Sequence, residues 1–319
     1  MTDNYKNLYD NYTWQVPNEF NIAEAICDQH AHGKDIALVY EDQNGKTSRY
    51  TFRDLQKLSN RLANAYRHLG INKGDRIGIL LSQQPETLIG HLAGFKVGAI
   101  NIPLFTLFGP EALEFRLNNS EAKTVIVDSG NINKLIEIKS RLPHLESIIC
   151  IDDQKDAKNN IVPFTELIEY ASDNFETVKT SPDDPALIIY TSGTTGPPKG
   201  AVHAHRVLLG HMPGVEVSHN LFPQPGDFFW TPADWAWIGG LIDVLLPSLY
   251  HKVPVLACRF KKFSPDEAIR LIISHGVRNV FFPPTALKMI RASDPQNCEK
   301  LNLRTVASGG ESLGEEILE

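Results

Sequence analysis

Ten consecutive residues from Thr191 to Gly200 (TSGTTGPPKG) carry four hydroxyl groups, three glycines and one lysine. Together they offer backbone N–H groups, side-chain donors and a positive charge within one small volume, which is what a polyphosphate requires. The glycines let the backbone approach an anion closely. The spacing differs from that of a Walker A loop, because Lys199 follows Pro198 and precedes Gly200. A plain glycine/threonine hairpin turn is the structural alternative, but it needs neither four hydroxyls nor a lysine.

A second glycine-rich segment, Ser308 to Ser312 (SGGES), follows a predicted strand and precedes a predicted helix. A turn of this kind binds anions at the N-terminus of its helix. The alternative is a tight strand-to-helix turn in which Ser312 serves as the helix N-cap. These residues alone leave both interpretations open, and only the upstream loop favours the first.

Three of the four tryptophans lie within eight residues, at Trp230, Trp235 and Trp237. Such a cluster suits an apolar pocket with one hydrated edge. The alternative is that they are ordinary core aromatics, which is a stronger alternative for Trp230 and Trp235 than for Trp237.

The loop YTSGTTGPPKG resembles the phosphate-loop signature of the adenylate-forming superfamily, and the resemblance extends from about Tyr50 to Glu319. It implies that a carboxylate and ATP give acyl-AMP and pyrophosphate, and that the acyl group then passes to a thiol. It also implies an inert clamp rather than a nucleophilic serine or threonine. By this resemblance, the residues that hold the β- and γ-phosphates are Thr191, Ser192, Gly193, Thr194, Thr195, Gly196 and Lys199.

The resemblance places Gly310, Glu311 and Ser312 against AMP. The segment from Trp230 to Gly240 is similar to the acyl-pocket segment of acetyl- and medium-chain acyl-CoA synthetases, which implies that Trp237, Gly239 and Gly309 line the acid site. Family members restricted to acetate carry larger side chains where Gly239 and Gly309 stand. We therefore predict an acid larger than acetate, such as a medium-chain, branched or aromatic one.

The implied reaction is that of an acid–thiol ligase that uses ATP, Mg²⁺ and CoA. The family's magnesium-placing glutamate, its ribose-binding aspartate and the lysine of its small C-terminal domain would all lie beyond Glu319, and the helix that SLGEEILE begins has no cap. We therefore interpret the chain as the N-terminal part of a longer enzyme and expect it to be inactive alone. Two alternatives are an adenylation enzyme that loads a carrier-protein thiol and a non-catalytic nucleotide-binding paralogue.

Amphipathic helices alternate with short apolar strands, which predicts an α/β fold with layered, mostly parallel sheets flanked by helices. The polar stretch 171–185 suggests a division into a first α/β subdomain, 1–180, and a second, 181–319. Strands are predicted at 76–81, 99–103, 123–127, 147–151, 186–191, 227–231, 253–257, 277–282 and 304–307. A helix is predicted from Phe52 to a terminal Gly70, and others begin near Pro85, Pro110, Val207, Gly240, Ser264, Pro284 and Ser312.

Composition excludes several classes of protein. Lys and Arg number 31 against 38 Asp and Glu, a net charge of −7 without charge blocks, so nucleic acid is a poor partner. Four scattered cysteines suit free thiols better than disulfides or zinc. No signal peptide or membrane span is visible, which favours the cytoplasm. The pair His203 and His205 lacks a ligand partner at metal spacing, so no metal site is predicted. The oligomeric state stays open.

Overall fold

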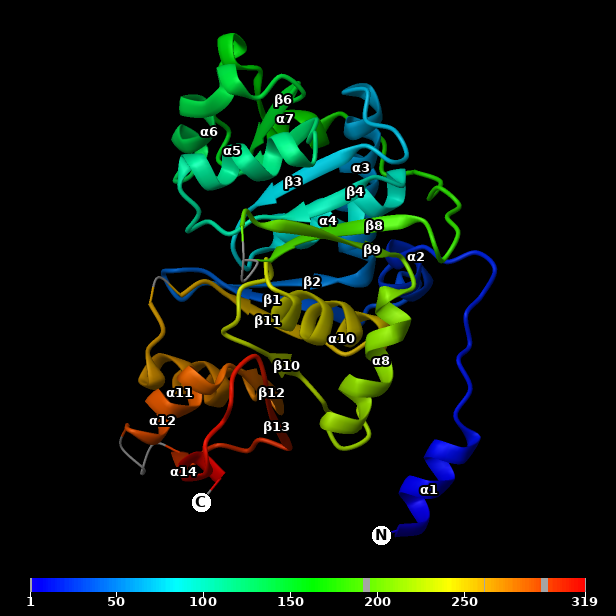
Figure 1. Cartoon of the computed structure of the whole chain (residues 1–319), viewed down its shortest axis with the longest axis vertical. Helices are drawn as coiled ribbons and strands as arrows, with labels where there is room; N and C mark the ends of the chain where they lie inside the picture. Colours follow the sequence, from blue (N-terminus) through cyan, green and yellow to red (C-terminus); the bar gives the residue numbers. More distant parts are fainter. Residues whose placement is uncertain (1, 192–195, 261, 294–297, 319) are drawn as a thin grey trace.

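The computed structural model describes residues 2–191, 196–260, 262–293 and 298–318, and these form two sheets separated and covered by helices (Figure 1). The larger sheet has the strand order β7-β6-β5-β3-β4-β8-β9 and is parallel apart from the antiparallel pair β8–β9. Its strands are β3 (Arg76–Leu80), β4 (Ile100–Pro103), β5 (Thr124–Val127), β6 (Ser147–Cys150), β7 (Ile161–Pro163), β8 (Pro185–Thr191) and β9 (Lys199–Ala204).

The second sheet has the order β13-β12-β10-β11-β1-β2 and is parallel apart from the antiparallel hairpin β1–β2. Each sheet takes strands from both sides of residue 180, so the predicted subdomain boundary does not coincide with the division between the sheets. The strands of this sheet are β1 (Ile36–Glu41), β2 (Thr47–Thr51), β10 (Phe229–Trp230), β11 (Val255–Cys258), β12 (Asn279–Phe282) and β13 (Thr305–Ser308).

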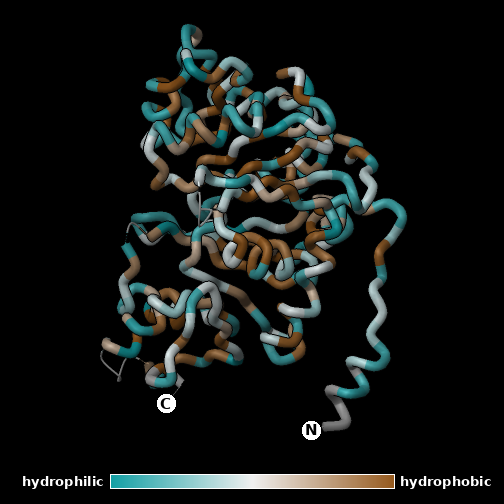
Figure 2. Tube along the Cα trace, in the orientation of Figure 1, coloured by the Kyte–Doolittle hydropathy of each residue, from teal (hydrophilic) through white to brown (hydrophobic). Residues whose placement is uncertain are grey.

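Helices form three layers around the two sheets. Helices α5 (Pro110–Asn119) and α6 (Ile132–Ile138) cover the outer face of the larger sheet, and α11 (Pro265–His275) and α12 (Pro284–Arg291) cover the outer face of the smaller one. The largest core lies between the sheets around α3 (Phe52–His68) and α4 (Pro85–Val97). Apolar residues accordingly concentrate in the interior strands and helices (Figure 2).

The remaining helices lie at the ends of the chain and around the space between the sheets. They are α1 (Thr2–Asn11), α2 (Ile22–Ile26), α7 (Phe164–Glu169), α8 (Val207–Ser218), α9 (Ile238–Gly240), a π-helical turn (Leu241–Leu245), α10 (Leu246–Tyr250) and α14 (Glu315–Leu318). Short 3-10 turns occupy Asp28–His30, Lys139–Arg141 and Ala157–Asn159. Helix α1 stands apart from the sheets at the end of an extended segment (Figure 1). Among the described helices, none has the length and apolarity that crossing a membrane requires.

The sequence patterns located most of these elements. Helix α3 begins as predicted, because Thr51 and Asp54 form a capping box, and Gly70 follows its end with a φ of +78°. The α/β class with mostly parallel sheets is confirmed. The strand predicted at 227–231 is only Phe229–Trp230, and the C-terminal helix begins at Glu315 rather than directly after Ser312. Pattern reading missed the β1–β2 hairpin and the strand β7.

Candidate functional site

The predicted phosphate loop closes the antiparallel hairpin β8–β9, in which Thr191 is the register partner of Lys199. Tyr190 fastens this hairpin to α5, because its hydroxyl donates to Asn119 Oδ1 at 2.7 Å. A Cβ on Gly200 would lie 2.8 Å from a side-chain carbon of Ile188, so a glycine is required at this crossing of the two strands. Lys199 is exposed and forms no ion pair within the described part of the chain. Thr191, Gly196 and Lys199 therefore lie together at one hairpin tip, while Ser192, Gly193, Thr194 and Thr195 lie outside the described residues.

The tryptophan segment follows the carboxyl end of β10 and separates its three tryptophans. Trp230 and Trp235 are fully buried core residues, whereas Trp237 is 53% exposed. The Trp237 ring packs edge-on against Phe105, with 5.4 Å between the ring centroids. Of the three, only Trp237 is placed where a ligand can reach it.

A tight turn presents Trp237. The Asp234 carboxylate accepts a hydrogen bond from the Ala236 N–H at 2.9 Å, and the Asp234 carbonyl accepts one from the Trp237 N–H at 3.0 Å. A Cβ on Gly240 would lie 2.4 Å from that same carbonyl oxygen, so the turn closes only with a glycine there. Burial raises the pKa of Asp234 to about 6, although Arg259 and the Ala236 hydrogen bond oppose this shift.

The third predicted segment follows the carboxyl end of β13. Gly310 has a φ of +97°, a backbone conformation that favours glycine, and Glu311 and Ser312 are exposed. Because α14 begins at Glu315, Ser312 is not the N-cap of that helix. These residues form a loop beyond the strand end, where their polar groups face solvent.

The two predicted acid-site glycines both contact the ring of Phe281 on β12. A Cβ on Gly239 would lie 2.9 Å from Phe281 Cε1, and a Cβ on Gly309 would lie 3.6 Å from Cε2. The ring therefore takes the room that glycine leaves at Gly239, whereas a Cβ on Gly309 would meet the ring at an ordinary contact distance. Phe281 also lines a cavity of about 320 Å³ between α8 and the strands β12 and β13.

Side-chain contacts show that the carboxyl edges of the two sheets face each other. Gln83, after β3, donates through Nε2 to the carbonyl oxygens of Thr231 at 3.0 Å and Ala233 at 2.6 Å, and its Oε1 accepts from the Cys258 N–H at 3.4 Å. Phe105, after β4, contacts Trp237 as described above. All three predicted segments thus follow the carboxyl ends of strands, the edge at which α/β sheets bind ligands.

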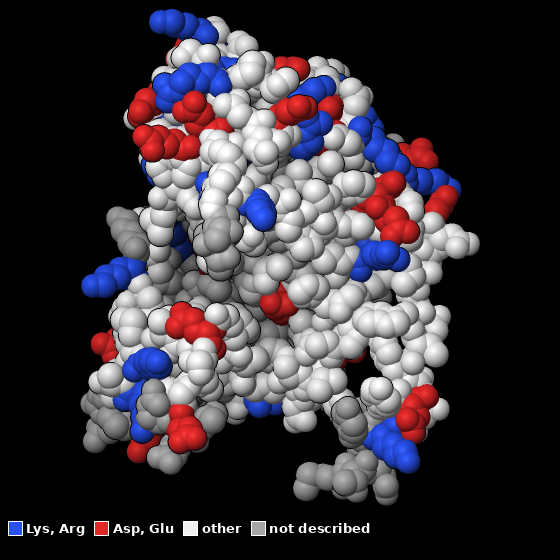
Figure 3. Space-filling model, in the orientation of Figure 1, with Lys and Arg blue, Asp and Glu red and all other residues white. Residues whose placement is uncertain are grey.

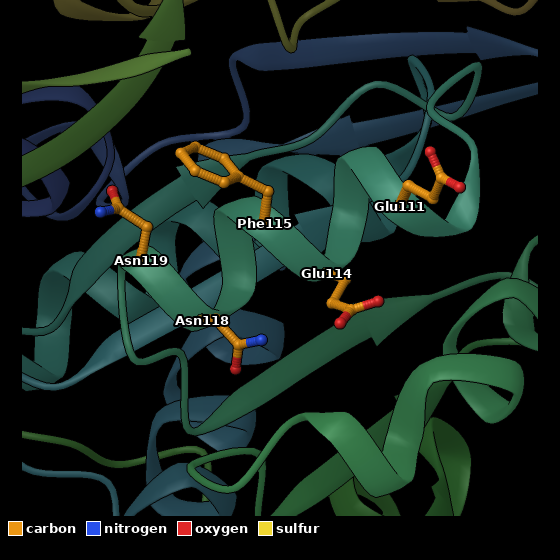
Figure 4. A pocket seen from close by; sticks show the side chains of 5 residues that line it. All are labelled: Glu111, Glu114, Phe115, Asn118 and Asn119. Atoms are coloured by element: carbon orange, nitrogen blue, oxygen red, sulfur yellow. The ribbon is translucent and has the colours of Figure 1, made fainter. Parts of the chain in front are cut away.

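The composition of the surrounding surface gives no other strong candidate. On the face in Figure 3, acidic and basic side chains are intermixed above and below a largely uncharged centre. A cavity of about 640 Å³ lies along α5, but all five of its lining side chains come from that one helix, and two of them are Glu111 and Glu114 (Figure 4). Acidic side chains on one helix face do not suit a phosphate. Within the described residues, no group of three or more His, Cys, Asp or Glu side chains is arranged to hold a metal ion.

His203 and His205, the pair weighed as metal ligands from the sequence, differ in their surroundings. His205 is fully buried, and its Nδ1 accepts from the Ile22 N–H at 3.2 Å. Burial lowers the pKa of His205 to about 4. Burial also lowers the pKa of His203. His205 is thus a neutral core residue that joins β9 to α2.

Comparison with known proteins decides the family. The profile described as AMP-binding enzyme matches residues 27–319. The chain belongs to the AMP-binding enzyme family. It is similar to the acetyl-coenzyme A synthetase of Bacillus subtilis, with 30% identity over 99% of this chain and 57% of the relative. A human mitochondrial acyl-coenzyme A synthetase is 26% identical over 95% of this chain and 53% of its own length.

Solved structures agree. A crystal structure of a Brucella canis acyl-CoA synthetase superposes on this AMP-binding enzyme with a TM-score of 0.89 and 27% identity, and the match covers 98% of this chain and 58% of that one. The chain spans about half the length of the curated relatives that it matches.

Sequence reasoning missed the residues that join the segments. The sequence patterns assigned no role to Gln83, Phe105 or Phe281, although Phe281 opens the segment FFPPTALKMI and Phe105 ends the segment GAINIPLF, which both resemble segments of the adenylate-forming superfamily. A signal was present for Gln83, because polar residues directly after a buried strand mark the carboxyl edge of a parallel sheet. No pattern in the sequence identifies Phe281 as the neighbour of both Gly239 and Gly309, since its contact with them depends on strand order.

Proposed function

We propose that the whole protein activates a carboxylic acid with ATP to an acyl-adenylate and then transfers the acyl group to CoA. The observation that carries this proposal is the position of three segments at the facing carboxyl edges of the two sheets: the Thr191–Lys199 hairpin tip, the Trp237 turn and the Gly309–Ser312 loop. Family membership supports the use of ATP. Because the named relatives are acetyl- and acyl-CoA synthetases, CoA is favoured over a carrier-protein thiol as the acceptor.

In the proposed reaction, an oxygen of the carboxylate attacks the α-phosphorus of ATP. The bond from that phosphorus to the bridging oxygen breaks, and pyrophosphate leaves with the electron pair. Negative charge on the leaving pyrophosphate rises in the transition state, so donors and a cation fixed around it lower the barrier. The CoA thiolate then attacks the acyl carbonyl carbon, and AMP leaves.

We assign the binding of pyrophosphate oxygens to the hairpin tip. Lys199 supplies a positive charge that no described carboxylate neutralises, and Gly196 has a φ of +89°, which permits a sharp turn around an anion. The full proposed set is Thr191, Ser192, Gly193, Thr194, Thr195, Gly196 and Lys199.

The adenylate and the acid are assigned to the facing loops. Gly310, Glu311 and Ser312 are proposed to contact AMP, since their loop is exposed at the end of β13. Trp237, Gly239 and Gly309 are proposed to line the acid. Magnesium is expected to accompany ATP, but the described residues provide no three-carboxylate or histidine set for it, so no step is assigned to the metal.

We further propose that the acid is larger than acetate. The support is the cavity of about 320 Å³ next to Phe281, which falls at the lower end of the usual range for small-molecule sites, about 300–1,000 Å³.

Pyrophosphate release by the full-length protein tests the function. A panel of acetate, hexanoate and benzoate is assayed with ATP, with and without CoA, and acyl-CoA is followed by mass spectrometry. Lys199→Ala is expected to lower kcat for adenylation by about 100-fold or more, as removal of a transition-state charge partner commonly does, with an unchanged melting temperature. An unchanged rate, or no acid-dependent pyrophosphate release at all, would refute the proposal. An acetate preference of ten-fold or more would refute the proposed acid size.

A further inference from the structure

The cavity next to Phe281, here named the α8 cavity, has one wall of almost bare backbone. Gly210 and Gly214 lie one turn apart on α8, and a Cβ on either would meet no atom within 4 Å. Across the cavity, Phe281 and Ala307 are register partners on neighbouring strands, so their side chains share one face of the sheet. The part of the cavity between these residues is therefore apolar and suited to a chain or a ring.

Five polar side chains complete the lining: Ser218, His219, Ser308 and the pair His211 and Asp243. His211 of α8 and Asp243 of the π-helical turn both line the cavity, with 2.7 Å between Nδ1 and Oδ1. Their side chains are 29% and 30% exposed. Because the carboxylate accepts from the Nδ1–H, the ring is held in one orientation and Nε2 has no hydrogen-bond partner within the described part of the chain.

An imidazole nitrogen at the wall of an apolar cavity is a specificity element. In a site that hydrogen-bonds a substrate hydroxyl, an analogue without that hydroxyl leaves the protein group unpaired and is rejected. We propose that the α8 cavity receives an acid whose far end carries a hydroxyl group, which hydrogen-bonds to His211 Nε2 while Asp243 positions the ring. This inference rests on the proposed function and names the substrate class of the same site.

The charges of the lining favour a neutral hydroxyl over an ionised group. Among the described residues that line the cavity there is no lysine or arginine, so a second carboxylate would enter beside Asp243 without a cation of its own. An ammonium group would face Asp243 but also the imidazole that already occupies its Oδ1. A hydroxyl donates to the unprotonated Nε2 and requires no further counter-ion.

Matched acids test the assignment in the full-length protein. The ratio of kcat/KM for 6-hydroxyhexanoate to that for heptanoate, which has a methyl group in place of the hydroxyl, is expected to be about ten or more. The pair 4-hydroxybenzoate and 4-methylbenzoate tests a ring in place of a chain. A ratio near or below one in both pairs would overturn the proposal. So would a preference for 6-aminohexanoate over the hydroxy acid, since Asp243 would then be acting as a counter-ion.

Variants assign the effect to His211. His211→Phe is expected to reduce the hydroxyl-to-methyl ratio to about one, whereas Asp243→Asn, which keeps an acceptor for the Nδ1–H, is expected to retain most of it. The matched control is His251→Phe. It breaks a similar pair at the other end of α8, where His251 Nε2 lies 2.8 Å from Glu216 Oε1 outside the cavity, and it should leave the ratio at the wild-type value. An equal effect of both Phe variants would overturn the role of His211.

The two proposals fail in different ways. If no acid supports pyrophosphate release, the proposed function fails. If acids are activated but the hydroxyl-to-methyl ratio is near one in the wild-type protein, only the substrate class fails, and this measurement does not depend on whether any variant folds.

Discussion

Gln83 links the two sheets directly beneath the Trp237 turn, and its loss should weaken both stability and acid binding. The buried side chain makes two hydrogen bonds of ordinary length, at 3.0 and 2.6 Å to the carbonyls of Thr231 and Ala233, and one long bond, at 3.4 Å from the Cys258 N–H. Gln83→Leu keeps the approximate volume but removes all three bonds. At about 1 kcal/mol for each bond, plus a cost for buried groups left unpaired, the free energy of unfolding should fall by about 2–4 kcal/mol.

The neighbouring Gln84 provides the control. Its side-chain nitrogen is buried without a hydrogen-bond partner among the described residues, and although Gln84 is the N-cap residue of α4, its side chain makes no capping hydrogen bond. Gln84→Leu removes no bond, so the expected loss is about 0.5 kcal/mol or less. A thermal melt should separate the two variants by about 3–8 °C, because the shift is roughly 2 °C per kcal/mol for a large domain.

The kinetic constants of Gln83→Leu test the same contacts independently of its stability. Gln83 holds the residues that lead into the Trp237 turn, so Gln83→Leu should raise the KM for the acid several-fold more than the KM for ATP. Equal melting temperatures and equal KM values for Gln83→Leu and Gln84→Leu would show that the inter-sheet bonds do not position the acid site.

Three further predictions concern stability. Gly240→Ala should lower the free energy of unfolding by about 3 kcal/mol or more, because its Cβ would lie 2.4 Å from the Asp234 carbonyl oxygen. In α8, a Cβ at Gly214 meets nothing within 4 Å, so Gly214→Ala should be neutral or stabilising by about 0.5–1 kcal/mol. Urea unfolding of both variants tests this contrast. Burial raises the pKa of Asp234 to about 6, so the stability that the protonated Asp234 contributes to the fold is lost as the pH rises through 6. The free energy of unfolding of Asp234→Asn should therefore exceed that of wild type by up to about 3 kcal/mol at pH 8 and by little at pH 3.5. A difference in melting temperature between the two proteins that stays constant across this pH range would contradict the raised pKa. Burial lowers the pKa of His205 to about 4. As the pH falls below 6.5, this imidazole therefore binds a proton in the unfolded chain before it does so in the folded one. Wild type should lose about 2 kcal/mol between pH 7 and 5 from this group, and His205→Gln should show a correspondingly flatter stability profile.

Local signals in the sequence predicted the elements well because each depends on neighbouring residues. The Thr51 cap, the positive φ of Gly70 and the apolar run from Arg76 to Leu80 need no distant partner. Sheet membership does depend on distant partners. The β1–β2 hairpin pairs with β11, more than two hundred residues later, and nothing in its sequence indicates which of the two sheets it joins.

In the candidate site, too, the sequence predicted what depends on neighbouring residues and not what depends on distant ones. The glycine- and threonine-rich loop and the Ser308–Ser312 segment were recognisable because their chemistry is concentrated in a few adjacent residues. The contacts of Gln83 and the pair His211–Asp243 join segments that lie far apart in the chain. Such contacts depend on how distant elements pack together, so no local pattern in the sequence predicts them.

Phe281 shows why residue size alone does not give pocket size. Glycine at 239 and 309 suggested an open cavity, yet the ring of Phe281 occupies the space next to both, with its edge where a Gly239 Cβ would clash. Under the proposed function, we expect the entry of a long acid to depend on this ring and on the α8 cavity, where the two glycines of α8 keep the wall bare. We therefore expect acid selection to depend on β12 and α8 as well as on the glycines in the recognisable motifs.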